Sequence, residues 1–337
     1  MLILAPMQGL TELLFRRVYN RCYPGAFDYA VSPFLSLTHG NLKVADKKIE
    51  DVLPALNDGS IPVVPQLLGH EPDEFVDLAN RLFQLGYDEV NWNMGCPMRR
   101  VAAKHRGSGI LPYPDEVRAL LDFIVPRLQP RLSVKVRLGY LSPDEIDRIV
   151  PVLNDYPLKD VTVHPRIGKQ VYSGRPNLDK LYEVLQALHH KVIYNGDVCS
   201  AFDYGKIRTR FPQIKDVMIG RGVLYNPLLP IQIRQQYAAD FADAALVGNA
   251  SVTAAGFIIE LMDEIVSLDV RDEAKIRKVK EYWCLLSKAL PGTEESKRKV
   301  LHATDLDAAL RLIREMAKKT AAPTPMPSKA PQITSPG

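Results

Sequence analysis

Short apolar runs recur along the first two thirds of the chain, and longer stretches with helical periodicity separate them. Residues 73–86, 114–125 and 142–154 carry apolar side chains at helical spacing, and each stretch begins with Pro, Asp or Ser. Strands that alternate with helices indicate a parallel sheet. The predicted strands are 2–7, 28–34, 62–69, 88–95, 132–139, 159–166, 191–198 and 216–223.

This count favours a (β/α)8 TIM barrel over an open doubly wound sheet. Eight strand-helix units within about 225 residues match the barrel. No G-x-G-x-x-G turn of the dinucleotide-binding type follows the first strand, which argues against the open sheet. The runs also end in chemically capable residues at the side where barrel enzymes build their active sites. These residues are Met7, Gln66, Asn93, Lys135, His164, Asn195 and Arg221.

The pattern changes after about residue 240. From 253 to 319 only helical periodicity remains, and the last residues are rich in Pro, Ser and Thr. A segment of that composition cannot bury enough apolar surface to fold. We therefore predict a catalytic barrel over 1–240, a small helical domain over 241–320 and a disordered tail over 321–337.

Composition is that of an ordinary globular protein, with 46% hydrophobic and 24% charged residues. The four cysteines lie far apart without C-x-x-C or zinc spacing, so we expect no disulfide framework and no metal site. The start MLILAPM lacks a basic n-region, and no apolar run reaches the roughly 20 residues of a membrane helix. We expect a cytoplasmic monomer.

Charge is mildly positive overall, at +4, and is concentrated near the end of the chain. Residues 271–319 hold 13 Lys or Arg and 8 Asp or Glu, a net charge of +5. Such a run is either a solvated helical face or a surface for nucleic-acid phosphates.

Glycine-containing turns follow the last two predicted strands. They are Asn195-Gly196-Asp197 and Gly220-Arg221-Gly222. Loops at these positions form a phosphate site in many barrels, because glycine lets backbone N–H groups approach the anion. Arg221 would add a charge-assisted contact. Either turn alone would more simply reverse the chain, whereas the two together indicate a ligand that carries phosphate.

Polar side chains also interrupt the apolar runs. Lys135 is costly to bury without a ligand, so it predicts a Schiff base or a donor to a ring or phosphate, unless it extends to water. Gln66 either faces a heterocycle edge or is a satisfied core residue. His164 and Arg166 end the sixth strand together, which favours a binding site.

Cys96 stands in NMGCP, between Gly95 and Pro97, at the end of the fourth predicted strand. A buried inert thiol is the common fate of cysteine. The flanking glycine and proline instead indicate a loop that presents the thiol at the barrel mouth, where it can act as nucleophile or acid. A basic segment follows it, MRRVAAKHRGSGI, long enough to form a lid.

Taken in order, these motifs resemble those of the tRNA-dihydrouridine synthases. The set comprises APM (5–7), Gln66, NMGCP (93–97), VKVR (134–137), HPR (164–166), NGD (195–197) and IGRG (219–222). YSGRPN (172–177) and K-x-x-W-x-x-x-x-K-x-L-P-G (280–292) extend it beyond the barrel motifs.

The resemblance implies an FMN-binding barrel, a helical tRNA-binding domain and NADPH-dependent reduction of particular tRNA uridines to 5,6-dihydrouridine. It implies hydride transfer from reduced FMN to C6 and protonation of C5 by Cys96. The uridine must be flipped out of its stack to reach a barrel mouth. FMN would be held by Pro6, Met7, Gln8, Gln66, Lys135, His164, Asn195, Gly196, Asp197, Gly220 and Arg221. The substrate would meet Asn93, Arg99, Arg100 and Arg166.

The sequence departs from that family at Pro33 and Asn91, where acidic residues are more usual, and at Arg99-Arg100, which replace a lysine-containing pair. Arginines beside Cys96 would lower its pKa and oppose an acid role, so we expect them to point toward tRNA phosphates. Three alternatives remain open: a flavin barrel oxidoreductase for a small pyrimidine or enone, a Schiff-base lyase using Lys135, and a tRNA-binding protein without catalysis. The basic helical segment favours tRNA as the substrate.

Overall fold

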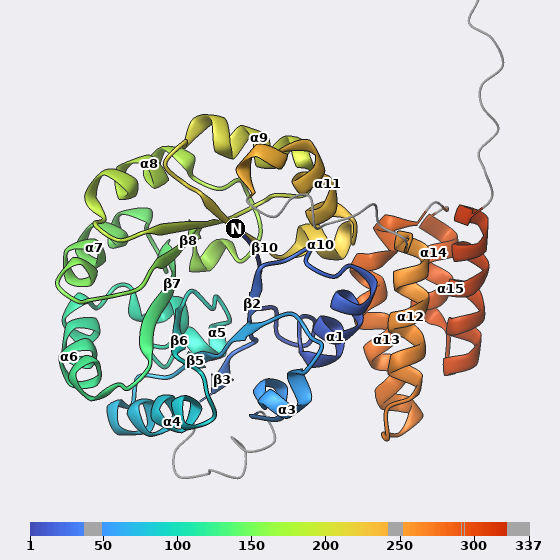
Figure 1. Cartoon of the computed structure of the whole chain (residues 1–337), viewed down its shortest axis with the longest axis horizontal. Coiled ribbons are helices and arrows are strands. Elements are labelled where there is room, and N and C mark those ends of the chain that lie inside the picture. Colours follow the sequence, from blue (N-terminus) through green and yellow to red (C-terminus); the bar gives the residue numbers. More distant parts are fainter. Residues whose placement is uncertain (37–48, 242–251, 291, 293, 322–337) are drawn as a thin grey trace, which may run out of the picture.

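Ten short parallel strands form one curled sheet in the computed structural model (Figure 1). The structure describes residues 1–36, 49–241, 252–290, 292 and 294–321. The strand order is β3-β5-β6-β7-β8-β9-β10-β1-β2-β4. The strands are β1 (Leu2–Leu4), β2 (Tyr29–Val31), β3 (Leu35–Ser36), β4 (Val63–Val64), β5 (Gln66–Leu68), β6 (Glu89–Met94), β7 (Arg131–Gly139), β8 (Val161–Ile167), β9 (Val192–Asn195) and β10 (Asp216–Ile219).

The two ends of this strand order come from the same two segments of the chain. β2 lies in the second predicted run and β3 directly follows that run, while β4 and β5 lie in the third run, which Pro65 interrupts because it has no N–H to donate. β2 pairs with β4 at one end of the strand order, and β3 pairs with β5 at the other. These pairings join the two ends of the strand order, so the sheet closes on itself as a barrel of eight strand segments. The barrel prediction is confirmed.

Helices on the outside follow the predicted periodicity closely. α4 (Pro72–Gln84) and α6 (Pro114–Ile124) both begin at a proline, the residue that suits a first helical position. α7 (Ile146–Asn154) follows the turn η4 (Pro143–Glu145), which Ser142 caps by accepting from the N–H of Asp144 at 3.2 Å. The other barrel elements are α1 (Leu13–Cys22), η1 (Glu50–Val52), α3 (Pro54–Asn57), α5 (Arg99–Ala102), η2 (Gly107–Ile110), η3 (Val125–Arg127), η5 (Gly168–Gln170), α8 (Leu178–Ala187), α9 (Ala201–Arg210), α10 (Arg221–Tyr225), α11 (Leu229–Gln236) and η6 (Ala238–Asp240).

The remaining helices pack together at one side of the barrel, beside α1 (Figure 1). Aromatic rings join the two parts: Phe15 of α1 stacks on Tyr282 at 6.1 Å between centroids and meets Phe257 edge-on at 5.6 Å. We call these helices the helical bundle: α12 (Ala254–Val266), α13 (Asp272–Leu286), η8 (Ser287–Ala289), α14 (Glu294–His302) and α15 (Leu306–Ala321). The predicted tail beyond them, from residue 322 onward, lies outside the described residues.

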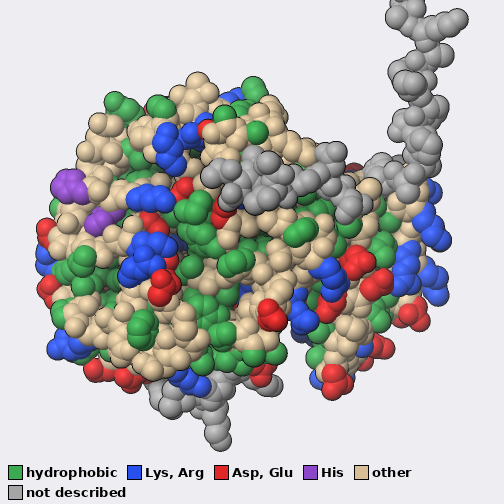
Figure 2. All heavy atoms as spheres, viewed as in Figure 1, with side chains coloured by type: hydrophobic (Ala, Val, Ile, Leu, Met, Phe, Trp, Pro, Cys, Tyr) green, Lys and Arg blue, Asp and Glu red, His purple; other side chains and the backbone are tan. Residues whose placement is uncertain are grey.

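Charged side chains of both signs are interspersed over the surface in Figure 2, with basic groups gathered at the outer edge of the helical bundle. In the parts of the chain that the structure describes, no helix is both long and apolar enough to cross a bilayer. The exposed cations on α14 and α15 are Arg298, Lys299, Arg311, Arg314, Lys318 and Lys319.

Candidate functional site

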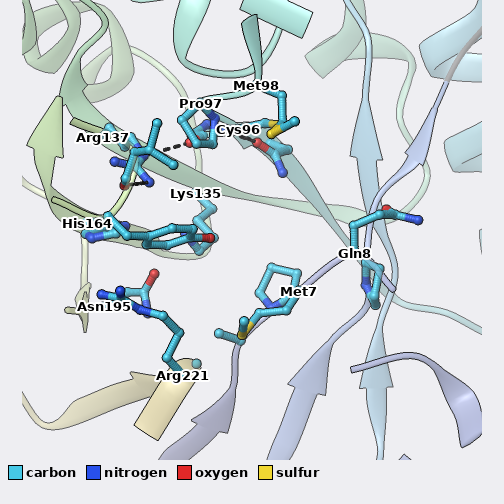
Figure 3. A pocket seen from close by; sticks show the side chains of 18 of the residues that line it. Met7, Gln8, Cys96, Pro97, Met98, Lys135, Arg137, His164, Asn195 and Arg221 are labelled. Atoms are coloured by element: carbon cyan, nitrogen blue, oxygen red, sulfur yellow. Dashed lines mark hydrogen bonds between the residues drawn. The ribbon is translucent and has the colours of Figure 1, made fainter. Parts of the chain in front are cut away.

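A cavity of about 440 Å³ opens at the carboxyl ends of the strands. Figure 3 shows Lys135, His164 and Arg221 along one side of it, with Met7 across from them. Residues from the turns after β1, β6, β9 and β10 contribute to its wall. Of the residues singled out in the sequence, those that line the cavity are Pro6, Met7, Gln8, Asn93, Cys96, Arg100, Lys135, His164, Asn195, Gly196, Asp197, Gly220 and Arg221.

Three residues of the predicted site do not line the cavity: Gln66, Arg99 and Arg166. Gln66 is completely buried beneath it, and Arg166 is only 1% exposed and engaged by protein groups. Arg99 is exposed at the start of α5.

Cys96 is held at the cavity wall by its backbone. Its N–H donates to the side-chain oxygen of Asn93 at 2.8 Å, and its carbonyl accepts from the N–H and hydroxyl of Ser108 at 3.0 and 2.9 Å. Gly107 allows this close approach, since it has φ +57° and a Cβ there would lie 2.7 Å from the Cys96 carbonyl oxygen. The turn is therefore fixed on both sides of the thiol.

Burial raises the pKa of the Cys96 thiol, although the Met98 N–H and the cations of Arg137, Lys135 and Arg100 oppose the shift. Arginines near Cys96 were expected to lower its pKa and oppose an acid role, but desolvation of the thiol outweighs them. At neutral pH the sulfur carries its proton.

A chain of buried hydrogen bonds lies under the cysteine. The Asn93 amide donates to Gln66 at 2.7 Å, and the Gln66 amide donates to Asn91 at 2.7 Å. Asn91 donates to the Ser133 hydroxyl at 3.0 Å, which donates to Glu89 at 2.8 Å. Every donor points toward the Glu89 carboxylate, so the links polarise one another in the same direction.

Arg137 was not singled out in the sequence, although it ends the VKVR motif. Its guanidinium donates to the carbonyls of Gly95 at 2.9 Å, Ile167 at 3.0 Å and Val171 at 2.7 Å. It thereby ties the cysteine turn to the segment after β8. Val171 has φ +51°, unusual for a β-branched residue, and is exposed at the rim.

Tyr172 is a second lining residue that the motifs contained but did not assign. Its ring lies under two guanidinium groups, 4.4 Å from Arg221 and 5.7 Å from Arg137, and 6.4 Å from the His164 ring. Cation–π contacts of this length are attractive. The sequence alone does not reveal these contacts, because Tyr172, Arg137 and Arg221 come from separate segments that only the fold brings together.

Lys135 and His164 are basic side chains on one side of the cavity, and both hold their protons less tightly than usual. Desolvation, together with the nearby charge of Arg137, lowers the pKa of Lys135 to about 7. Burial, then four neighbouring cations, hold the pKa of His164 well below its ordinary value. Lys135 has no hydrogen bond or ion pair to any described residue, so its ammonium is available to a ligand.

Asp197 neutralises two arginines at the other end of the cavity. Its carboxylate meets Arg166 at 2.5 and 2.9 Å and Arg221 at 2.7 Å. Burial acts to raise the pKa of Asp197, but the two guanidinium groups prevail and hold it below its usual range. Asp197 thus orients Arg221 beside the glycine turns rather than presenting a free carboxylate.

The cavity fits an aromatic ligand that also carries an anionic group. Glycines stand at both turns, and a Cβ on Gly220 would come within 3.4 Å of Ala5 and Met7, narrowing the space where backbone can approach the ligand. Among the lining residues that the structure describes, Arg221, Lys135 and Arg137 outnumber the one carboxylate, that of Asp197. The Met7 thioether and the Tyr172 ring offer apolar surface for contact with an aromatic ring.

Comparison with known proteins identifies relatives of one kind. Residues 3–322 match the family model described as dihydrouridine synthase (Dus). The chain is 30% identical over 233 residues to tRNA-dihydrouridine synthase B of Pasteurella multocida, covering 68% of this chain and 67% of that one. It is 26% identical over 336 residues to tRNA-dihydrouridine(16) synthase of Neisseria meningitidis, covering 94% and 95%.

Among solved structures, similarity extends to the barrel fold. Histamine dehydrogenase from Rhizobium matches with a TM-score of 0.54 at 10% identity, over 78% of this chain and 48% of that one. The old yellow enzyme homologue from Zymomonas mobilis matches with a TM-score of 0.50 at 11% identity, over 70% and 88%.

Proposed function

The chain belongs to the dihydrouridine synthase family, and from this premise we propose that its cavity binds FMN and one flipped uridine of tRNA, with Cys96 as the proton donor. The enzyme is a flavin-dependent oxidoreductase that reduces uridine in tRNA to 5,6-dihydrouridine. FMN as the flavin and NADPH as its reductant are the finer parts of the proposal.

FMN fits the residues that line the cavity. The glycine turns and the Asp197-oriented guanidinium of Arg221 suit its phosphate. Lys135, His164 and Asn195 suit the polar edge of an isoalloxazine ring, while Met7 supplies an apolar contact. When bound, the flavin supplies the hydride that adds to C6 of the uracil ring.

Cys96 carries the acid role because burial keeps its thiol protonated while its backbone fixes its position. Hydride addition at C6 leaves negative charge over C5 and O4 of the uracil. The Cys96 sulfur then gives its proton to C5, and the thiolate that remains is stabilised by the nearby cations of Arg137 and Lys135. This single observation, a held and protonated thiol at the cavity wall, supports the proposal best.

The tRNA is proposed to approach over the cavity rim and the helical bundle. Arg100 lines the cavity and Arg99 stands exposed beside it, both placed to meet phosphates near the flipped uridine. The exposed cations of α14 and α15 offer a second set of phosphate contacts. Arg166, which is buried against Asp197, acts through Arg221 and not on the substrate.

An anaerobic assay tests the function directly. Purified protein, dihydrouridine-free tRNA and NADPH are mixed, and the digested tRNA is searched by mass spectrometry for a uridine heavier by two hydrogens. Its appearance supports the proposal, and its position shows which uridine is reduced. A yellow protein that oxidises NADPH, leaves tRNA unchanged and reduces free pyrimidines or enones would overturn the tRNA assignment.

A further inference from the structure

The first loop of the barrel, residues 5–12, forms part of the cavity wall and runs directly into α1. Ala5, Pro6, Met7, Gln8 and Leu10 all line the cavity. The loop is secured from within by Thr11, whose hydroxyl accepts from the Met7 N–H at 2.8 Å and donates to the Ala5 carbonyl at 2.9 Å.

The same loop is also held from outside, by α13 of the helical bundle. Lys278 donates from Nζ to the Gly9 carbonyl and pairs with Glu12 at 3.1 Å. The other oxygen of the Glu12 carboxylate accepts from the Gly9 N–H at 3.0 Å. Lys278 and Glu12 therefore engage both peptide groups of Gly9, and Lys278 is only 20% exposed.

The backbone of Gly9 favours glycine, because its φ of +79° is a conformation that residues with a Cβ rarely adopt. Glu281, also on α13, lies next to it: a Cβ on Gly9 would come 2.5 Å from that carboxylate. One turn beyond Lys278, the hydroxyl of the buried Tyr282 donates to the Leu10 carbonyl at 2.7 Å. The carbonyls of Gly9 and Leu10, two consecutive residues of the 5–12 loop, thus both accept hydrogen bonds from α13 of the helical bundle.

The helical bundle also touches the opposite edge of the cavity. α10, which begins with Arg221, packs against α13 and η8. The Lys288 ammonium of η8 lies 3.8 Å from the centre of the Tyr225 ring at the end of α10. The same group of helices therefore contacts turns on both sides of the cavity.

We propose that Lys278 is a positioning residue that couples the helical bundle to the flavin site, by fixing the 5–12 loop in the shape that lines the cavity. The inference rests on the proposed function, in which this bundle receives tRNA and the cavity receives FMN. Because coupling between two binding sites is reciprocal, tRNA on the bundle strengthens FMN binding, and FMN strengthens tRNA binding.

Four proteins test the coupling: wild type, Lys278→Met, Lys278→Arg and the matched control Arg277→Met, which alters an exposed cation on the same helix. FMN affinity is measured from the quenching of FMN fluorescence, with and without tRNA. Hydrogen exchange of the peptide covering residues 5–12 is followed in the absence of flavin. Thermal unfolding establishes that each variant is folded.

Lys278→Met is expected to bind FMN about 5–20-fold more weakly, because it loses charge-assisted hydrogen bonds that shape the site. The amides of residues 5–12 should exchange faster, and tRNA should no longer improve FMN affinity. Lys278→Arg should recover most of each effect, and Arg277→Met should match wild type in FMN affinity without tRNA and in the exchange of residues 5–12. Equal FMN affinity in Lys278→Met and wild type, or an equal loss in Arg277→Met, overturns the inference.

Glu12→Gln gives a second route that leaves the helical bundle unaltered. It removes the charge that Lys278 pairs with and should also accelerate exchange in the 5–12 loop. If wild type binds no flavin, the proposed function fails, yet the exchange data still decide whether α13 holds the loop. Unchanged exchange in both Lys278→Met and Glu12→Gln would show that Lys278 does not fix the loop, and would overturn the inference.

Discussion

The side-chain oxygen of Asn93 lies 2.8 Å from the backbone nitrogen of Cys96 and accepts its hydrogen bond. The same oxygen accepts from the Gly95 N–H at 3.0 Å. A polar residue at the end of β6 thus sets the turn that presents the thiol. The Asn93 side chain therefore orients the turn that carries Cys96, the residue proposed to donate the proton.

Replacement of Cys96 by alanine should nearly abolish dihydrouridine formation while leaving flavin and tRNA bound. A positioned acid contributes about 10²–10⁴-fold to a rate, so single-turnover formation of dihydrouridine should slow by that factor. Flavin absorbance of the purified variant checks that the cavity is intact. Cys284→Ser, which changes an exposed cysteine on α13, is the control. Turnover at the wild-type rate in Cys96→Ala would rule out the proton-donor role.

Asn91→Leu should weaken the hydrogen-bond chain that leads through Gln66 and Asn93 to the backbone of Cys96. The substitution leaves the Gln66 amide without its acceptor at 2.7 Å and Ser133 without its donor at 3.0 Å. Leaving such buried groups unpaired costs about 1–3 kcal/mol each, so urea unfolding should show a lower free energy of unfolding.

Turnover of Asn91→Leu should fall more than its flavin content, because the hydrogen-bond chain ends at the Cys96 turn and not at Arg221 and the glycine turns proposed to hold the FMN phosphate. Asn20→Ala, which removes an exposed hydrogen bond to the Gly59 carbonyl, should change both by little. Loss of flavin with normal turnover per bound flavin would contradict this reading of the chain.

The fold was predictable from the sequence because barrel strands and helices differ in hydrophobic period. The split of the third run at Pro65 was not anticipated, since a proline within a short apolar run does not reveal which neighbours its strand halves pair with. Closure of the barrel comes from the pairing of the second and third segments, on both sides of that split.

The site was predictable where a motif residue follows the end of a strand, as Cys96 and Arg221 do, or lies within a strand and lines the cavity, as Lys135 does. Gln66 and Arg166 were placed at the cavity by their motifs, yet their partners are asparagines and an aspartate from other segments. Strand position alone cannot distinguish a side chain that lines a cavity from one that supports it. Arg137 and Tyr172 show the reverse case, since their role depends on contacts between distant loops.

Asp197→Asn should destabilise the protein. Arg166 is almost fully buried and keeps only carbonyls and the His164 ring as partners once the carboxylate is gone. Since Asp197 itself is 37% exposed, solvent screens part of the loss, and about 1–3 kcal/mol is expected. Urea unfolding at pH 7 measures it.

The sign of the pH dependence at Asp197 follows from its lowered pKa. Its ion pairs stabilise the protein above the unfolded-state pKa of about 3.9 and are lost as pH falls through the lower folded-state value. The gap between wild type and Asp197→Asn should therefore be full at pH 6 and close toward pH 3. A gap that stays constant over this range would mean that the carboxylate charge contributes nothing.

Lys135→Met should make the ligand-free protein more stable at pH 6, by at least a few degrees in Tm. Desolvation lowers the folded-state pKa of Lys135 to about 7, against about 10.4 when unfolded. Below pH 7 the lysine is charged in both states, so folding bears the full cost of burying the charge. Between pH 7 and 10.4 the unfolded state binds more protons, so wild-type stability rises with pH relative to the variant.

The advantage of Lys135→Met should thus shrink steadily from pH 6 to pH 10, and Lys206→Met, which alters an exposed lysine on α9, should show no such trend. Saturating FMN should reverse the order at pH 6, because a ligand that accepts from the ammonium favours the charged form. Thermal melts of both variants across this pH range, with and without FMN, measure these differences. A pH-independent gap without FMN would mean that the buried ammonium already has a partner, and an unchanged order with FMN would remove Lys135 from the flavin site.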